Sequence, residues 1–238
     1  MPTIYTVGHS TRTAEEFLAL LQAFAIKLVA DIRTIPRSRK NPQFEAEALK
    51  RSLGSRDIGY VHMPKLGGLR RPRKDSVNAG WENLSFRGYA DYMQTDAFTS
   101  GLDELIGAAE IQQTAIMCAE AVPWRCHRSL VGDALLIRHF DVIDIFSATN
   151  TKPHKLTTWA RVEGDRVTYP SGASEGESSC EPLGETSGSP SSHTKECKTK
   201  KITISQKTWC RALIRRSTKR GASKTQSTQT ERSKVISR

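Results

Sequence analysis

Residues 3–33 read TIYTVGHSTRTAEEFLALLQAFAIKLVADIR, in which two β-prone runs flank an amphipathic segment. The first run, residues 3–7, stops at Gly8, and hydroxyl residues that could cap a helix follow it. Apolar side chains then recur at helical spacing over residues 17–24, before a second apolar run over residues 26–30. The stretch therefore predicts a strand, a helix and a second strand.

The same alternation continues along the chain. We expect helices over about residues 44–53, 86–109 and 126–140, and strands over residues 59–62, 114–118 and 142–146, the last of which closes the pattern. Strands that alternate with helices form mostly parallel sheets through right-handed crossovers. The sequence thus predicts an α/β fold, Rossmann-like in three layers, with helices on both faces of a mostly parallel sheet.

Composition changes near residue 170. Residues 1–170 predict a single α/β domain, whereas residues 171–238 form a low-complexity tail rich in Ser, Thr, Lys and Arg. Such a tail cannot bury enough apolar surface to offset its conformational entropy, so we expect it to be disordered. The tail also carries about +8 of the formal net charge of +11. The basic balance of the whole chain is therefore no argument that the domain binds nucleic acid.

Two protein classes are disfavoured by the sequence. No apolar run approaches the ~18–20 residues needed to span a bilayer, and the N-terminus lacks the pattern of a signal peptide. Five cysteines without a repeating spacing do not suggest a secreted disulfide scaffold. We therefore expect a cytoplasmic protein without a membrane partner, whose thiols are reduced.

Polar residues follow four of the predicted strands at the point where each strand ends. In open α/β sheets, ligands bind beyond the carboxyl ends of the strands, and parallel strands bring those ends to one edge. The sequence therefore predicts one site at that edge. Its candidate residues are Gly8-His9-Ser10, Asp31 with Arg33, His62 with the segment to Gly68, and Cys118 with Glu120.

The segment CAEAVPWRCHR, residues 118–128, is the densest in reactive groups. It joins a strand end to a helix start, where backbone N–H groups favour anions and depress the pKa of a thiol. Cys126, beside His127 and Arg128, is the better candidate nucleophile, and Cys118 is the better candidate for burial. The alternative is that both cysteines are purely structural.

The remaining candidates also have two interpretations. His9 and His62 each follow a strand and could be satisfied structural side chains or members of the site. Asp31 and Arg33 could form an ion pair that pins their loop. In the functional alternative, Arg33 binds a phosphate or carboxylate with two N–H groups while Asp31 orients a histidine.

A metal centre is disfavoured by spacing, because C-x7-C-H matches no common zinc pattern, and we expect no metal and no cofactor. A phosphatase-like C-x5-R loop is also not matched, since six residues separate Cys118 from Arg125. Basic loops over residues 37–40 and 70–74 could be solvated or could follow a phosphate backbone. Aromatic residues available for stacking on a base are Tyr60, Trp81, Phe86 and Trp124.

Four ordered motifs carry a family resemblance: TVGHS, DIR, the H-x-P-x-L-G-G of residues 62–68, and CAE followed by CHR. With PHKLT at residues 153–157, they resemble the bacterial and archaeal family called domain of unknown function 488 over nearly all of residues 3–170. The resemblance implies no reaction, but it supports motif positions. These are His9, Ser10, Asp31, Arg33, His62, Cys118, Glu120, Cys126, His127 and Arg128.

The leading hypothesis is an enzyme that acts on a phosphate-bearing substrate, a nucleotide or nucleic acid. Arg33 and Arg128, with Ser10, Asp31 and His62, would bind the anion; Cys126 or Cys118, with His127, would supply a thiolate; and Glu120 with His9 would move protons. The alternative is a noncatalytic nucleotide or nucleic-acid binding module, in which the cysteines are structural.

Overall fold

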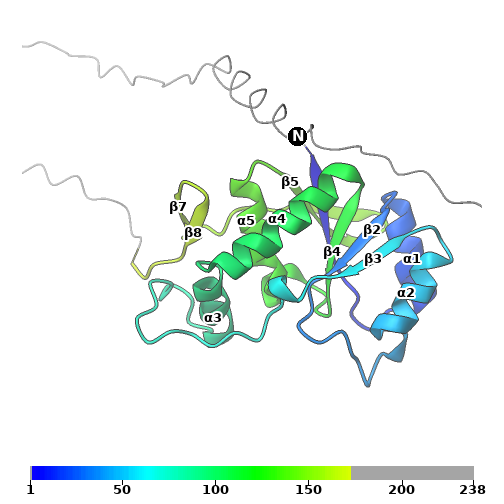
Figure 1. Ribbon diagram of the computed structural model, residues 1–238, viewed down its shortest axis with the longest axis horizontal. Coiled ribbons are helices and arrows are strands. Elements are labelled where there is room, and N and C mark those ends of the chain that lie inside the picture. Colours follow the sequence, from blue (N-terminus) through cyan, green and yellow to red (C-terminus); the bar gives the residue numbers. More distant parts are fainter. Residues whose placement is uncertain (1, 173–238) are drawn as a thin grey trace, which may run out of the picture. The chain divides into compact units, whose positions relative to one another are not determined.

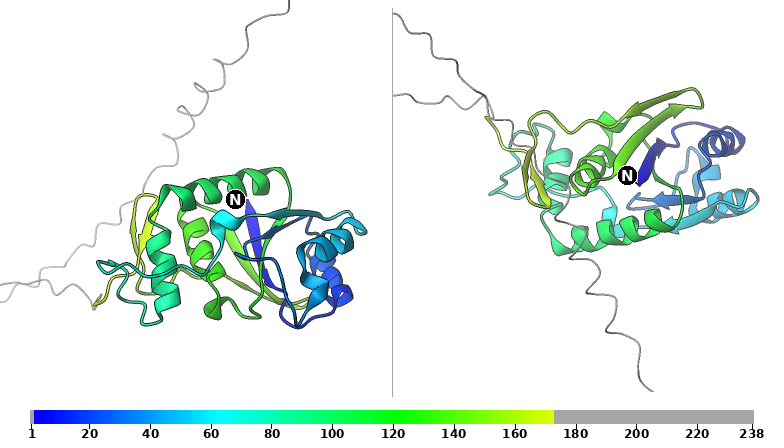
Figure 2. Two further views of the ribbon diagram at one scale, coloured as in Figure 1. Left: turned by 60° about the horizontal axis from the view of Figure 1, so that its bottom comes forward. Right: turned by 90° about the horizontal axis from the view of Figure 1, so that it is seen from above.

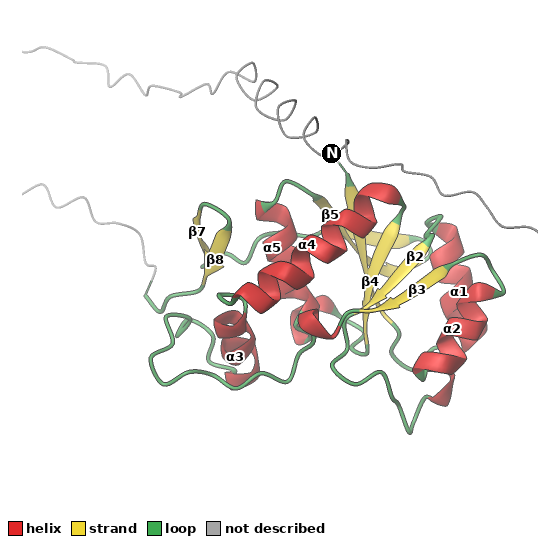
Figure 3. Cartoon of the chain, in the orientation of Figure 1, coloured by secondary structure: helices red, strands yellow, loops and turns green. Residues whose placement is uncertain are grey.

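The sheet is the organising element of the computed structural model, which describes residues 2–172. Its strands are β1 (Thr3–Gly8), β2 (Leu28–Asp31), β3 (Gly59–His62), β4 (Thr114–Cys118), β5 (Asp141–Ser147) and β6 (Asn150–Pro153). They lie in the order β3-β2-β4-β1-β5-β6, with β6 antiparallel to β5 and the other pairs parallel (Figures 1 and 3). The predicted tail, residues 171–238, falls almost entirely outside the described residues.

Helices cover both faces of the sheet. They are α1 (Ala14–Ala23), α2 (Ala46–Gly54), α3 (Leu84–Tyr92), α4 (Asp96–Ile111) and α5 (Arg128–Ile137). Side chains alternate along β4, so that Ala115 and Met117 join the core under α1 and α2, whereas Ile116 and Cys118 join the core under α4 and α5. Figure 2 shows the sheet between these two groups of helices. The predicted three-layer α/β class is confirmed.

Local sequence explains where the first helix begins. Thr13 caps α1 by accepting the backbone N–H of Glu16, and the Glu16 carboxylate accepts the backbone N–H of Thr13 in return. This capping box satisfies two of the backbone N–H groups that a helix start leaves unpaired. The turn between β1 and α1 is thereby fixed, and with it the position of His9.

Two details differ from the sequence prediction. The helical pattern over residues 86–109 is divided between α3 and α4, because Thr95 caps a new helix by accepting the N–H of Phe98. The strand β5 is also not the last. The exposed strand β6 and the hairpin β7 (Arg161–Glu163) and β8 (Arg166–Thr168) follow it, with too few buried residues to give a period-two signal. Within residues 2–172, no helix has the length and apolar character needed to cross a bilayer.

A network of buried hydrogen bonds joins the segment after β6 to α5 and β5. The two ring nitrogens of His154 lie 3.1 Å from Asp133 Oδ1 on α5 and 3.0 Å from Asp144 Oδ2 on β5. Tyr169 donates its hydroxyl to Asp133. Burial alone would lower the pKa of His154, but the two carboxylates raise it to about 9. His154 is therefore a buried cation between two acids at neutral pH.

The strand register brings the predicted site segments to one edge. Gly8 pairs with Cys118 across β1 and β4, and Asp31 pairs with His62 across β2 and β3. Because β2 also pairs with β4, all four strand ends are contiguous. This edge holds the cavity described next.

Candidate active site

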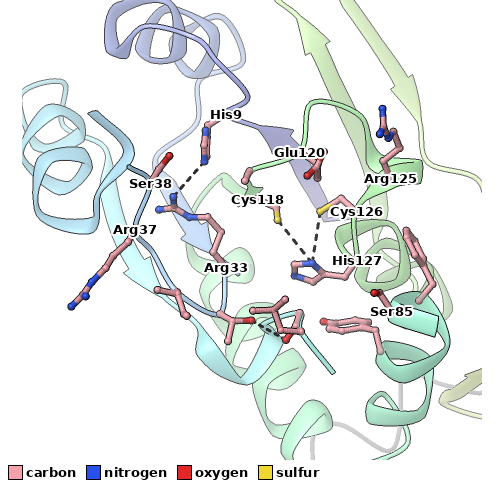
Figure 4. A pocket seen from close by; sticks show the side chains of 17 residues that line it. His9, Arg33, Arg37, Ser38, Ser85, Cys118, Glu120, Arg125, Cys126 and His127 are labelled. Atoms are coloured by element: carbon pink, nitrogen blue, oxygen red, sulfur yellow. Dashed lines mark hydrogen bonds between the residues drawn. The ribbon is translucent and has the colours of Figure 1, made fainter. Parts of the chain in front are cut away.

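A cavity of about 450 Å³ lies beyond the carboxyl ends of β1, β2 and β4. Its reactive lining comes from Cys118, Cys126, His127, Glu120, His9 and Arg33. Figure 4 shows the two sulfurs and the imidazole of His127 at its centre, with Arg37 and Ser38 on one side and Arg125 on the other. The fold therefore brings six of the ten predicted site residues around one space.

His127 presents one ring nitrogen to both cysteines. Its Nδ1 lies 3.9 Å from Cys118 Sγ and 3.8 Å from Cys126 Sγ. Its Nε2 lies 3.1 Å from the backbone carbonyl of Ile32. Because a carbonyl can only accept, Nε2 carries the hydrogen, and Nδ1 of the neutral ring turns its lone pair towards the sulfurs.

The pKa values of the two thiols are shifted in opposite directions. A hydrogen bond with Cys118 and the charge and backbone N–H of Arg128, at the start of α5, outweigh burial and lower the pKa of Cys126 to about 7. Cys118 gives its hydrogen to Cys126, and this bond together with burial raises the pKa of Cys118. Cys126 is thus the thiol of the pair that ionises near neutral pH, as its position at a helix start predicts.

Arg33 is held by a dense set of buried contacts. Its Nε and Nη2 donate to the two carboxylate oxygens of Asp31 at 2.9 and 2.6 Å, and Nη2 also donates to the carbonyl of Phe44. Tyr60 donates its hydroxyl to the same Asp31 carboxylate. Asp31 therefore neutralises Arg33 and pins the loop, which leaves Nη1 as the part of Arg33 not bound to Asp31.

His9 is a neutral member of the cavity wall. Its Nδ1 donates to the carbonyl of Ser10 at 2.8 Å, and Arg33 Nη1 lies 3.4 Å from its Nε2. Its ring stacks on Phe44 with centroids 4.2 Å apart. Burial, with the nearby Arg33 charge, lowers the pKa of His9 to about 4. At neutral pH His9 can accept a proton only weakly.

Besides Asp31, three predicted residues take positions outside the cavity lining. Arg128 is 1% exposed and donates to the carbonyls of Glu120 and Ala121, so it holds the loop between β4 and α5. His62 donates to the carbonyl of Arg33 at 2.8 Å. Ser10, with a φ of 51°, supplies the carbonyl that His9 uses. Arg128 and His62 thus bind backbone carbonyls of the loops that carry the site and do not line the cavity.

Gly8 and Gly68 lie so close to other groups of the site that a side chain would not fit. A Cβ on Gly8 would lie 1.8 Å from the carbonyl oxygen of Glu120, and one on Gly68 would lie 2.9 Å from Nδ1 of His127. Only glycine leaves room for the loop that carries Glu120 and for the imidazole. The sequence marked both glycines as motif positions without indicating what they contact.

The sequence did not place Arg37 and Arg125 opposite each other. Both are exposed, line the cavity and make no ion pair among the described residues. Arg37 appeared only as part of a basic loop, and Arg125 only as a neighbour of the cysteines. Tyr89, which is buried in the core, also reaches the cavity, where its ring centroid lies 4.9 Å from that of His127.

The same cluster could hold a metal ion. One ligand atom each from Cys118, Cys126 and His127 lie within 4.8 Å of one another. Two thiolates and an imidazole suit a soft divalent ion such as zinc, and a carbonyl-bound second nitrogen is typical of metal-binding histidines. The sequence spacing did not indicate this arrangement, because the path of the loop between β4 and α5, and not a short spacing motif, brings the cysteines together.

The family described as Domain of unknown function DUF488 matches residues 13–135, which is just over half of the chain and includes the cysteine cluster. No curated protein and no solved structure matches the chain.

Proposed function

The chain belongs to the family Domain of unknown function DUF488, and we propose that the cavity is the active site of a thiol-dependent enzyme acting on a phosphate-bearing substrate, a nucleotide or nucleic acid. The observation that carries the proposal is the arrangement of Cys126, His127 and the Ile32 carbonyl. It contains a nucleophile, a base within reach of it, and a third group that orients the base.

In the proposed mechanism, Cys126 reacts as a thiolate. His127 Nδ1 accepts a proton from the thiol pair and returns it to the leaving group, while its Nε2–H stays on Ile32. Cys126 Sγ attacks an electrophilic atom of the substrate, and the bond from that atom to the leaving group breaks as the leaving group takes the proton from His127. Water then attacks the same atom and breaks its bond to Sγ. Glu120, exposed at the cavity wall, is the candidate base for the second step.

The phosphate is assigned to the exposed arginines of the cavity. Arg37 and Arg125 have no carboxylate partner among the described residues, whereas Arg33 is neutralised by Asp31. Their guanidinium groups can each offer two N–H donors to a phosphate. Arg128, the other arginine that the sequence suggested, is occupied by backbone carbonyls, so we do not assign it to the substrate.

Binding of zinc or a similar ion by the cysteine cluster is the second candidate function. It is favoured by the nearly equal distances from His127 Nδ1 to the two sulfurs. A bound ion would occupy both thiolates and block their alkylation. Measuring the metal content of the purified protein, and the alkylation rate before and after chelation, distinguishes the two candidates.

The proposal is tested by incubating the full chain with mononucleotides and short oligonucleotides and analysing products by mass spectrometry. We expect turnover that Cys126→Ser abolishes and that Cys197→Ser, outside the described residues, retains. Arg37→Ala and Arg125→Ala should each weaken nucleotide binding by about fivefold, whereas Arg51→Ala on α2 should not. Nucleotide binding without turnover would leave the alternative of a noncatalytic binding module and contradict the enzyme.

A further inference from the structure

A second, larger cavity of about 780 Å³ lies beside the candidate active site. Its walls come from the short 3-10 helix η3 (Pro123–Arg125), the end of β5, the strand β6 and the segment that follows β6. We call it the aromatic groove. It is defined by Trp81, Trp124, Phe146, Trp159, Lys152 and Lys155.

The indole rings of the groove are unusually open to solvent. Trp124 is 63% exposed and Trp159 is 38% exposed. Trp124 leans on Phe146 with ring centroids 5.9 Å apart, and Trp159 meets Trp81 edge to face at 5.2 Å. Each exposed indole is thus supported from one side while part of its surface stays accessible. Exposed aromatic side chains that gather in a cavity are typical of a binding site.

The accessible charges of the groove are positive. Lys152 and Lys155 are exposed and make no ion pair among the described residues. Lys152 Nζ lies 5.8 Å from the centroid of the Phe146 ring. The only carboxylate in the groove lining, that of Asp144, is buried and bonded to Thr6 and His154. Two lysines beside exposed aromatic rings suit a ligand with flat apolar faces and negative charges.

The groove and the active-site cavity share their dividing wall. Within η3, Trp124 faces the groove and the next residue, Arg125, lines the cavity. Phe86 lines the cavity and packs against Trp81 of the groove with centroids 4.8 Å apart. A ligand that extends past this wall could therefore occupy both spaces.

We propose that the aromatic groove binds single-stranded nucleic acid, with bases stacked on Trp124 and Trp159 and phosphates held by Lys152 and Lys155. The inference rests on the proposed function, because it makes the substrate an oligonucleotide whose next residue enters the cysteine cavity. Stacking on aromatic rings requires unpaired bases, so the groove selects a single strand over a duplex. An uncharged peptide could also stack on tryptophan, but it would leave the two lysines without a partner.

The test is fluorescence anisotropy of a labelled oligothymidylate added to the full chain. Trp124→Leu and Trp159→Leu should each weaken binding by about fivefold or more, the lower end of what stacking of one base contributes. Trp124→Phe should restore most of that loss, because phenylalanine keeps a stacking face. Ile111→Ala, at an apolar position on α4 that is even more exposed than Trp124, is the control and should bind like the unaltered chain.

Three results would overturn the proposal. Binding that ignores both leucine variants and is competed equally by inorganic polyphosphate would be nonspecific attraction by the basic chain. Duplex DNA that binds as tightly as the single strand would exclude stacking. Binding of a polyproline peptide, but not of oligothymidylate, in a tryptophan-dependent way would assign the groove to peptides. The alkylation rate of Cys126, measured without oligonucleotide, reports the proposed function separately.

Discussion

At the scale of single residues, chemically identical groups take different roles because their surroundings differ. Cys118 and Cys126 share one cavity, but the hydrogen bond between them lowers the pKa of Cys126 and raises the pKa of Cys118. Arg125 and Arg128 are three positions apart, yet Arg125 is exposed at the cavity and Arg128 is buried against two carbonyls. The sequence identified the reactive types, but only the packing separates these roles.

We expect Arg128→Met to destabilise the fold by about 3 kcal/mol, because the carbonyls of Glu120 and Ala121 lose the charged donor that a buried Arg128 side chain provides. Arg125→Met should change stability by less than about 0.5 kcal/mol, as surface substitutions usually do. Urea denaturation of both variants measures the difference. Equal stabilities would contradict the structural role given to Arg128.

Gly68→Ala is expected to displace the imidazole of His127, since the new methyl group would lie 2.9 Å from Nδ1. The alkylation of Cys126 at neutral pH should then slow, because the base that faces its sulfur has moved. Gly107→Ala, which meets no neighbouring atom, is the control and should leave that rate unchanged. An unchanged rate in Gly68→Ala would remove His127 from the proposed mechanism.

At the scale of elements, the sequence predicted most of the sheet and the edge where the site lies. Strand ends were marked by buried apolar runs that stop at polar residues, as at Asp31 and Cys118. The hairpin after β5 was not predicted, because all residues of β6 are exposed and give no alternation. The pairing of Cys118 with Cys126 could not be predicted either, since it depends on the path of the loop between them.

His154 links β5, α5 and the following segment, and its charge makes this link dependent on pH. Because its pKa in the folded protein is raised to about 9, the stability it adds is fully present below about pH 6.5 and is lost as pH rises through about 9. The difference in unfolding free energy between the unaltered chain and His154→Gln should therefore shrink over this range. His139→Asn, at an exposed position, should show no such trend.

Denaturation by urea at about pH 6 and about pH 9 measures this difference directly. Using the difference between the two chains removes the contribution of Cys126, whose lowered pKa acts in the opposite direction over the same range. A difference that stays constant with pH would show that His154 is not a cation in the folded protein.

At the scale of the whole molecule, positive charge is unevenly distributed along the sequence. The first 170 residues are almost neutral, and the excess of positive charge follows them. Tyr169, whose hydroxyl binds Asp133, lies at the end of the buried network within the described residues. We therefore expect residues 2–172 to keep their structure when the basic residues that follow them are removed.

Removing residues 173–238 is expected to leave the melting temperature within the small range of surface changes. Oligonucleotide binding by the shortened chain should depend less steeply on salt, because fewer phosphates are neutralised and fewer counterions are released. Calorimetry and anisotropy at several salt concentrations check both expectations. A large loss of melting temperature would show that these residues stabilise the domain.

The central claim is that Cys126 is a thiolate nucleophile in the cavity, and the pH profile of its alkylation tests it most directly. Peptide mapping after short exposure to iodoacetamide measures Cys118 and Cys126 separately in the native full chain. We predict that Cys126 reacts with an apparent pKa of about 7 while Cys118 stays unlabelled. Labelling of Cys126 only at the higher pH of an ordinary thiol, or no faster than in a free peptide, would contradict the claim.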